Sequence, residues 1–73
     1  MNGKIVRILA DKGFGFIKGE DGKEYFFHRQ DAAEFDYLVL DIEGGRTVQV
    51  IFESVPSPKG PRAADVIRDV SGY

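Results

Sequence analysis

The chain has 73 residues with a formal net charge of −2, and its lack of cysteine together with nine glycines and three prolines indicates one small domain without disulfides. The absence of cysteine also excludes thiolate metal sites and cysteine nucleophiles, and it is compatible with a reducing cytoplasm. No apolar stretch approaches the roughly 20 residues that span a bilayer, and the first residues contain no apolar signal core, so we expect a soluble, cytoplasmic protein.

The first half of the chain predicts three short strands. Residues 4–10 are mostly β-branched and aliphatic, and they are too few for a capped helix, which favours a strand. A second strand is predicted at residues 14–18, because its aromatic side chains are spaced two apart. The pair Asp21-Gly22 favours a tight hairpin that leads to a partner strand at residues 24–29.

Alternation gives each strand of this hairpin two different faces. Phe14 and Phe16 share one face of the first strand, and Gly15 and Ile17 share the other. In the partner strand Phe26 and His28 share a face, opposite to that of Tyr25, Phe27 and Arg29.

The second half of the chain predicts a connector and a fourth strand. Residues 30–35 are interpreted as a helical connector of one or two turns, followed by an irregular stretch that ends at Gly44-Gly45. Residues 46–53 alternate well, which predicts a strand. Its two faces are formed by Val48, Val50 and Phe52 and by Thr47, Gln49 and Ile51.

All three prolines lie at residues 54–61, which we therefore predict to be a loop, and a fifth strand follows this loop. In residues 62–70 we expect Ala64, Val66 and Arg68 to alternate regularly along the strand. Five short strands with almost no helix must close on one another or leave exposed edges. We therefore predict an all-β, five-stranded antiparallel OB-fold barrel over residues 1–70, with residues 71–73 as a frayed C-terminus or the start of a linker.

Residues 12–17 read KGFGFI, the basic-Gly-aromatic-Gly-aromatic-aliphatic pattern of a ribonucleoprotein motif. Two rings on one strand face are stacking platforms for bases, the glycines beside them leave room for an approaching base, and Lys12 adds a phosphate contact. The alternative is that Phe14 and Phe16 belong to the core, as most phenylalanines do. That arrangement would leave Gly15 and Ile17 as the solvent face.

Residues 10–17 resemble the first ribonucleoprotein motif of the bacterial cold-shock domain family, and residues 25–29 resemble its second. Similarity at residues 3–5, 43–52 and 59–66 extends this resemblance over nearly the whole chain. The resemblance implies a barrel that binds single-stranded RNA or DNA and serves as an RNA chaperone or transcript regulator. It implies that the core includes Ile17 and Phe27. It further implies a nucleic-acid face made of Lys12, Phe14, Phe16, Phe26 and His28, with Lys59 near its rim.

The chain departs from that family at several aromatic positions. The family's first-strand Trp-Phe pair is replaced by Arg7-Ile8, and the phenylalanine that ends its second motif is replaced by Arg29. Because a guanidinium can stack on a base and pair with a phosphate, we expect Arg7 and Arg29 to contact nucleic acid. Tyr37 is a candidate for the family's loop aromatic, and its alternative role is to pack against the end of the barrel.

Charge is unevenly distributed along the chain. Residues 3–29 hold six basic and four acidic side chains, whereas residues 30–58 hold one basic and six acidic ones. Residues 59–73 are again slightly basic, with three basic and two acidic side chains. We expect Lys18, within the basic first third, to follow the phosphates of a bound strand.

No other chemistry is predicted. His28 is the only histidine, so no metal site is expected, and no serine lies on a nucleophile elbow, so no enzyme activity is expected. We predict a monomer that needs no cofactor, whose partner is single-stranded RNA or DNA. The alternative is an OB-fold protein-interaction module that has lost nucleic-acid binding, which the missing rings and the acidic middle segment would suit.

Overall fold

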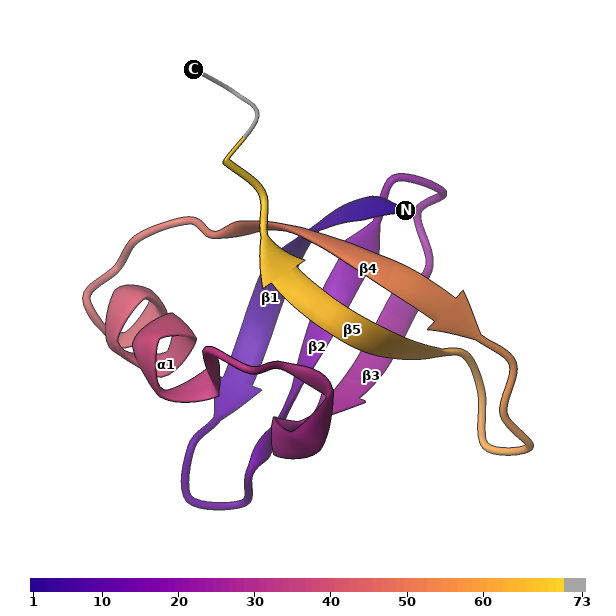
Figure 1. The fold of residues 1–73 in the computed structure, drawn as a ribbon, viewed down its shortest axis with the longest axis horizontal. Helices are drawn as coiled ribbons and strands as arrows, with labels where there is room; N and C mark the ends of the chain where they lie inside the picture. Colours follow the sequence, from indigo (N-terminus) through magenta and orange to yellow (C-terminus); the bar gives the residue numbers. More distant parts are fainter. Residues whose placement is uncertain (71–73) are drawn as a thin grey trace.

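The computed structural model describes residues 1–70, so the expectation for residues 71–73 lies outside the described residues. Within residues 1–70 the chain forms five strands, a short 3-10 turn η1 and the helix α1 (Figure 1). In chain order the elements are β1 (Asn2–Leu9), β2 (Phe14–Gly19), β3 (Glu24–His28), η1 (Arg29–Asp31), α1 (Phe35–Glu43), β4 (Gln49–Val55) and β5 (Arg62–Arg68).

The five strands close into a barrel in the order β1-β2-β3-β5-β4 (Figure 1). This topology confirms the predicted OB-type barrel. The pairs β1–β2, β2–β3, β1–β4 and β4–β5 are antiparallel. The closing pair β3–β5 is parallel, with Phe26 opposite Arg62, which is possible because η1, α1 and β4 form a long crossover between these two strands.

Alternate side chains of the strands point into the barrel and form its core. Ile17 and Phe27 have no exposed surface, so both lie in the core as expected. Val48, Val50 and Phe52, which were predicted to share one face of the fourth strand, are at most 3% exposed, so this face is the inner one. The other buried hydrophobic side chains of the described residues are Ile5, Tyr25, Ala32, Phe35, Leu38, Ala63 and Val66.

A β-bulge at Val6 reverses the direction of the side chains halfway along β1. Ile5 lies opposite Ile17 of β2, but Arg7 lies opposite Phe16, so β1 carries one extra residue between them. If β1 alternated regularly, Arg7, which follows the buried Ile5 by two positions, would point into the core. The bulge therefore moves the Arg7 side chain to the outer face of the barrel.

A second bulge divides β5 at Asp65. Ile67 of β5 lies opposite Ile51 of β4, and Ala64 lies opposite Glu53, so β5 carries one more residue than β4 between these two pairs. Asp65, in this interval, has a positive φ of 50°. As a result Ala63 and Val66, three positions apart, are both buried. The predicted regular alternation along this strand is therefore wrong, because Ala64 does not share the inner face with Val66.

The α-helix lies later in the chain than predicted. A 3-10 turn follows β3, and α1 occupies residues 35–43, where an irregular stretch was expected. Phe35 and Leu38 are buried, and Val39 and Ile42 pack against the core, which is the spacing of an amphipathic helix. Phe35, Val39 and Ile42 have modest helix propensity, so burial of this face stabilises α1. None of the helices within residues 1–70 is long and apolar enough to cross a membrane.

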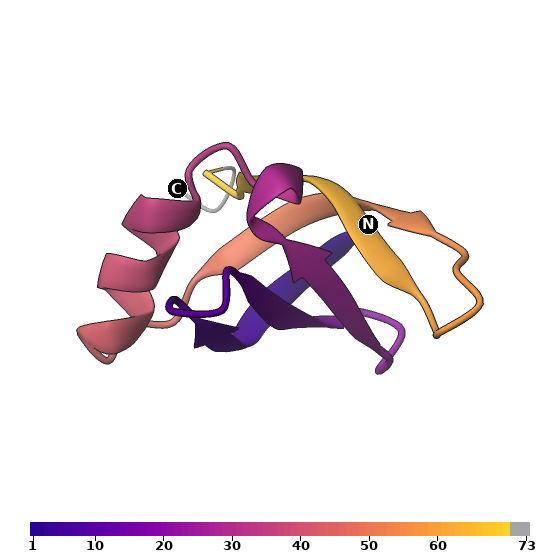
Figure 2. The same ribbon diagram turned by 90° about the horizontal axis from the view of Figure 1, so that it is seen from below.

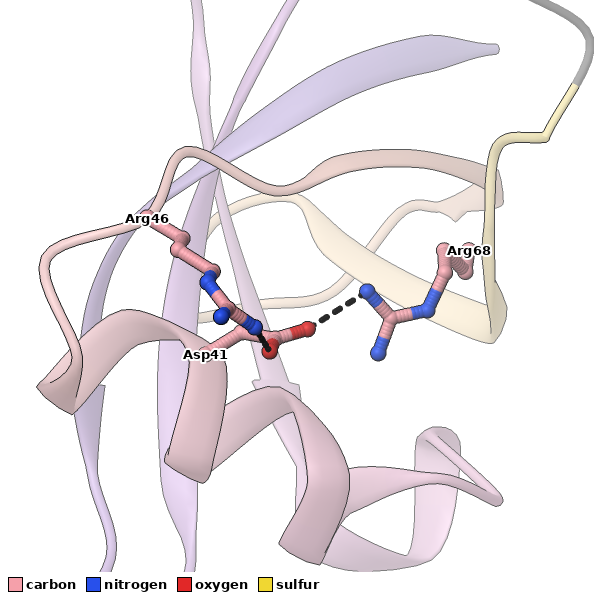
Figure 3. Close-up of polar contacts among 3 residues, drawn as sticks. All are labelled: Asp41, Arg46 and Arg68. Atoms are coloured by element: carbon pink, nitrogen blue, oxygen red, sulfur yellow. Dashed lines mark hydrogen bonds and ion pairs between the residues drawn. The ribbon is translucent and has the colours of Figure 1, made fainter.

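Asp41 anchors α1 to one end of the barrel, opposite the end that carries the β4–β5 loop (Figures 1 and 2). Its Oδ2 accepts a hydrogen bond from Arg68 Nη1 at 2.6 Å, and its Oδ1 accepts one from Arg46 Nη1 at 3.2 Å (Figure 3). The hydrogen bond from Arg68 is the main reason that the pKa of Asp41 lies below its ordinary value of 3.8. One carboxylate thus joins the helix to β5 and to the segment before β4.

Asp41→Asn is expected to lower the melting temperature at neutral pH, because it removes both ion pairs. Since the folded pKa of Asp41 is depressed, its contribution is present above the ordinary value of 3.8 and is lost as the pH falls through the lower folded pKa. Thermal melts should therefore show a difference between wild type and variant that shrinks below about pH 4. Glu43→Gln, at the exposed end of the same helix, is the matched control. If the melting temperatures of wild type and Asp41→Asn differed by the same amount at neutral and at strongly acid pH, this account would be contradicted.

Candidate nucleic-acid interface

Phe14, Phe16 and Phe26, here called the aromatic platform, lie together on the outer face of the β2–β3 hairpin. Phe14 is paired with His28 and Phe16 with Phe26 across the two strands, so these four side chains share one face. The ring centroids are 5.3 Å apart for Phe14 and Phe26, and 5.9 Å apart for the other two pairs. All three rings are partly exposed. The structure therefore brings together four of the residues predicted for the site.

Gly15 faces the interior between the two outward-facing phenylalanines. A Cβ atom built on Gly15 would lie 2.8 Å from the Phe27 ring and 2.8 Å from the carbonyl oxygen of Arg7. The expectation that this glycine leaves room for an approaching base is therefore wrong. It leaves room for the buried Phe27 ring, and this close approach fixes Phe14 and Phe16 on the outside.

Hydrogen bonds fix the turn of the platform hairpin. The Tyr25 hydroxyl donates to Asp21 Oδ2 at 2.6 Å, and the backbone N–H of Lys23 donates to Asp21 Oδ1 at 3.0 Å. The hydrogen bond from Tyr25 is the largest cause of the lowered pKa of Asp21, and it also raises the pKa of Tyr25. The Tyr25 ring is buried against the Phe52 ring, with the two ring centroids 4.9 Å apart, so the turn is tied to the core.

His28 ends β3 beside Phe14. Its backbone N–H donates to Asp31 Oδ2 at 2.9 Å, and its Nδ1 accepts a hydrogen bond from the backbone N–H of Gln30 at 3.3 Å. Because Nδ1 accepts, the neutral ring carries its proton on Nε2. In the part of the chain that the structure describes, no cluster of histidine and carboxylate side chains is arranged to hold a metal ion.

The predicted phosphate-binding cations surround the platform at different places. Arg7 lies directly opposite Phe16 and is exposed. Lys18 is exposed on the same outer face of β2, one alternation beyond Phe16. Lys12 is exposed in the turn before β2, and Lys59 lies in the β4–β5 loop. Cations therefore flank the rings on both sides.

Arg29 and Tyr37 lie beyond the His28 end of the platform. The predicted strand reaches Arg29, but β3 ends at His28 and Arg29 begins η1, so Arg29 does not share the inner face of Tyr25. Its guanidinium carbon lies 5.2 Å from the centroid of the Phe35 ring, a cation–π contact. Tyr37 is 66% exposed on α1, which contradicts the alternative that it packs against the barrel end. Arg29 and Tyr37 line a shared cavity of about 230 Å³.

Arg62 belongs to the same surface, although no sequence pattern predicted it as a site residue. It lies opposite Phe26 across the parallel β3–β5 pair, and it lines a cleft of about 500 Å³ between the platform and the β4–β5 loop. Regular alternation with Val66 would have turned Arg62 inward, and the bulge at Asp65 turns it outward. The sequence signal was a basic residue directly after Pro61, but its meaning depends on the bulge and on the parallel pairing.

Comparison with known proteins gives consistent matches over this whole barrel. The family described as the 'cold-shock' DNA-binding domain matches residues 1–69. Cold shock-like protein CspC of Bacillus cereus is 40% identical over 68 residues, which cover 93% of this chain and 98% of that protein. Cold shock protein 1 of Lactiplantibacillus plantarum is 36% identical over 70 residues, which cover 90% of this chain and 94% of that protein. Cold shock protein CspD of Bacillus subtilis is 37% identical over 67 residues, covering 92% and 96% respectively.

Truncating single phenylalanines should separate the platform from the core. Phe27→Ala is expected to destabilise the fold by about 3–5 kcal/mol, as truncation of a buried phenylalanine does. Phe14→Ala and Phe26→Ala remove rings that are already partly exposed, so they should lower the melting temperature far less. Thermal melts of the three variants measure this, and equal losses for Phe14→Ala and Phe27→Ala would invert the assignment of faces.

Proposed function

This chain belongs to the 'cold-shock' DNA-binding domain family, and we propose that its aromatic platform binds single-stranded RNA or DNA by base stacking. The observation that carries the proposal is the contact of three partly exposed phenylalanine rings on one outer face. A protein without a ligand for this face would leave a contiguous apolar patch in water, which is unusual for a monomeric surface.

The geometry of the rings favours unpaired bases over a duplex. Phe14 and Phe16 are inclined by 88°, and Phe16 and Phe26 by 69°, so no single flat ligand lies over all three rings. Separate bases of a flexible single strand satisfy such a surface, because each base turns to meet its own ring. Stacking of this kind contributes about 1–3 kcal/mol per base and tolerates different sequences.

Phosphate contacts complete the proposed mode of binding. Arg7, Lys12, Lys18 and Lys59 surround the platform, and each can pair with a backbone phosphate and release a counterion. The protein would then hold open strands without ATP or any cofactor. It would melt weak hairpins only by capturing strands that open spontaneously, which is the action of an RNA chaperone or a regulator of transcripts.

The comparisons do not favour the alternative of an interaction module without nucleic-acid binding. The family consists of nucleic-acid binders and not of enzymes. A monomeric state, the lack of a cofactor and a cytoplasmic location are further parts of the proposal.

Short oligo-pyrimidine strands are expected to bind, with an affinity that falls as the salt concentration rises, because lysine and arginine contacts release counterions. A duplex of the same length should bind more weakly, since its bases are already stacked. Fluorescence anisotropy at several salt concentrations measures both effects. Absence of binding to any single strand at low salt would refute the proposal and restore the interaction-module alternative.

Substitutions at Arg7 test whether its guanidinium stacks on a base. Arg7→Lys keeps the charge and loses the plane, so the salt dependence should persist while the affinity falls. Arg7→Trp should raise the affinity and slightly reduce the salt dependence. Arg29→Lys and Arg29→Phe are the matched pair, and smaller changes are expected there because the Arg29 guanidinium already lies over Phe35. If both Arg7 variants bind as the wild type does, Arg7 does not contact the ligand.

A further inference from the structure

The cleft beside the platform has the size and the walls of a site for one base. Its volume is about 500 Å³, within the range of roughly 300–1,000 Å³ that is usual for ligand pockets. Phe16 and Phe26 form one wall, and the β4–β5 loop with Lys59 forms another. Gly60 of this loop has a φ of 120°, a conformation that favours glycine, and the Pro61 carbonyl accepts a hydrogen bond from the Phe26 N–H at 3.3 Å.

Arg62 is held in a fixed place at the end of this cleft. Its Nη2 donates to Asp31 Oδ2 at 2.9 Å, and the same oxygen accepts the backbone N–H of His28 at 2.9 Å. The side chain of Asp31 is only 16% exposed, whereas that of Arg62 is 43% exposed. Within residues 1–70 the other guanidinium N–H groups of Arg62 have no hydrogen-bond partner. Asp31 therefore orients the guanidinium and leaves most of its donors for a ligand.

The angle between the two rings determines where a bound base would present its edge. Phe16 and Phe26 are inclined by 69°, so a base that stacks on one of them meets the other edge-on. Arg62 is the direct pairing partner of Phe26 and is on the same outer surface. A base stacked on Phe26 would therefore turn one edge toward the Arg62 guanidinium.

We propose that Arg62, positioned by Asp31, selects guanine for the base in this cleft, an inference that rests on the proposed single-strand binding. Guanine presents O6 and N7 side by side as two acceptors, which match two parallel donors of a guanidinium. Adenine presents a donor beside N7, and the carbonyl oxygens of thymine and uracil are separated by an N–H. Cytosine also offers two adjacent acceptors, but its single ring covers less of Phe26 than a purine does.

The test is a positional scan of single dG substitutions in a strand of about seven thymidines, a length within the roughly 4–16 nucleotides that one OB-fold covers. Fluorescence anisotropy gives, for each protein, the affinity of every dG strand relative to the all-thymidine strand. The wild type should prefer dG at one position by about fivefold or more, since a bidentate pair discriminates by at least about 1 kcal/mol. Strands with dA or dC at that position should not show this gain.

Variants then assign the preference to the Arg62 guanidinium. Arg62→Lys keeps the charge and removes the fork, so the dG preference should disappear. Asp31→Asn should reduce it, because the guanidinium is no longer held. Arg46→Lys and Asp41→Asn are matched controls, since they alter the same kind of ion pair at the α1 end of the barrel, and both should keep the dG preference.

Every other outcome would overturn the inference, and each points to a different explanation. If the wild type binds the all-thymidine strand and gains nothing from dG at any position, the cleft does not select guanine. If Arg62→Lys retains the dG preference, another group reads the base. If Arg62→Lys weakens all strands by the same factor, Arg62 contacts a phosphate. Binding to no strand at all would refute the proposed function itself.

Discussion

The close packing of the Phe27 ring against Gly15 is the contact on which the outer surface of this barrel depends. No side chain fits at position 15, because a Cβ atom there would lie 2.8 Å from that ring. Position 15 must therefore face inward, and alternation turns Phe14 and Phe16 outward. The register of the hairpin then adds Phe26 and His28 to the same face. A buried steric constraint thus determines which aromatic rings meet solvent.

The two bulges bring side chains of the neighbouring strands onto the same outer face. The extra residue at Val6 turns Arg7 out beside Phe16, and the extra residue at Asp65 turns Arg62 out beside Phe26. Across β1, β2, β3 and β5 the outer surface therefore presents a row of arginine, phenylalanine, phenylalanine and arginine. Both arginines would point toward the core if their strands alternated regularly. Local irregularity in the sheet produces this row of stacking groups with a cation at each end.

The exposed acidic side chains of the helix α1 lie at one end of the molecule. The helix α1 carries the exposed Asp36 and Glu43, and Figures 1 and 2 show it at the opposite end of the barrel from the β4–β5 loop with Lys59. Asp41 of the same helix is used internally, because Arg68 and Arg46 neutralise it. The acidic charge of α1 therefore lies away from the β4–β5 loop, where Lys59 lines the cleft beside the platform.

The sequence by itself determined the strands, the tight hairpin and which side chains share each strand face, because alternation and turn residues act over a few neighbouring positions. The buried positions of Ile17 and Phe27 and the outward direction of the rings were implied by the resemblance to cold-shock domains. The resemblance to cold-shock domains supplied the family. The tertiary structure alone decided the position of α1, since residues 35–43 become helical by burying one face against the barrel. It also decided the direction of Arg62, which depends on a bulge, on a parallel strand pair and on Asp31, far away in the sequence. Such features follow from contacts between distant segments, and no local pattern of residues encodes them.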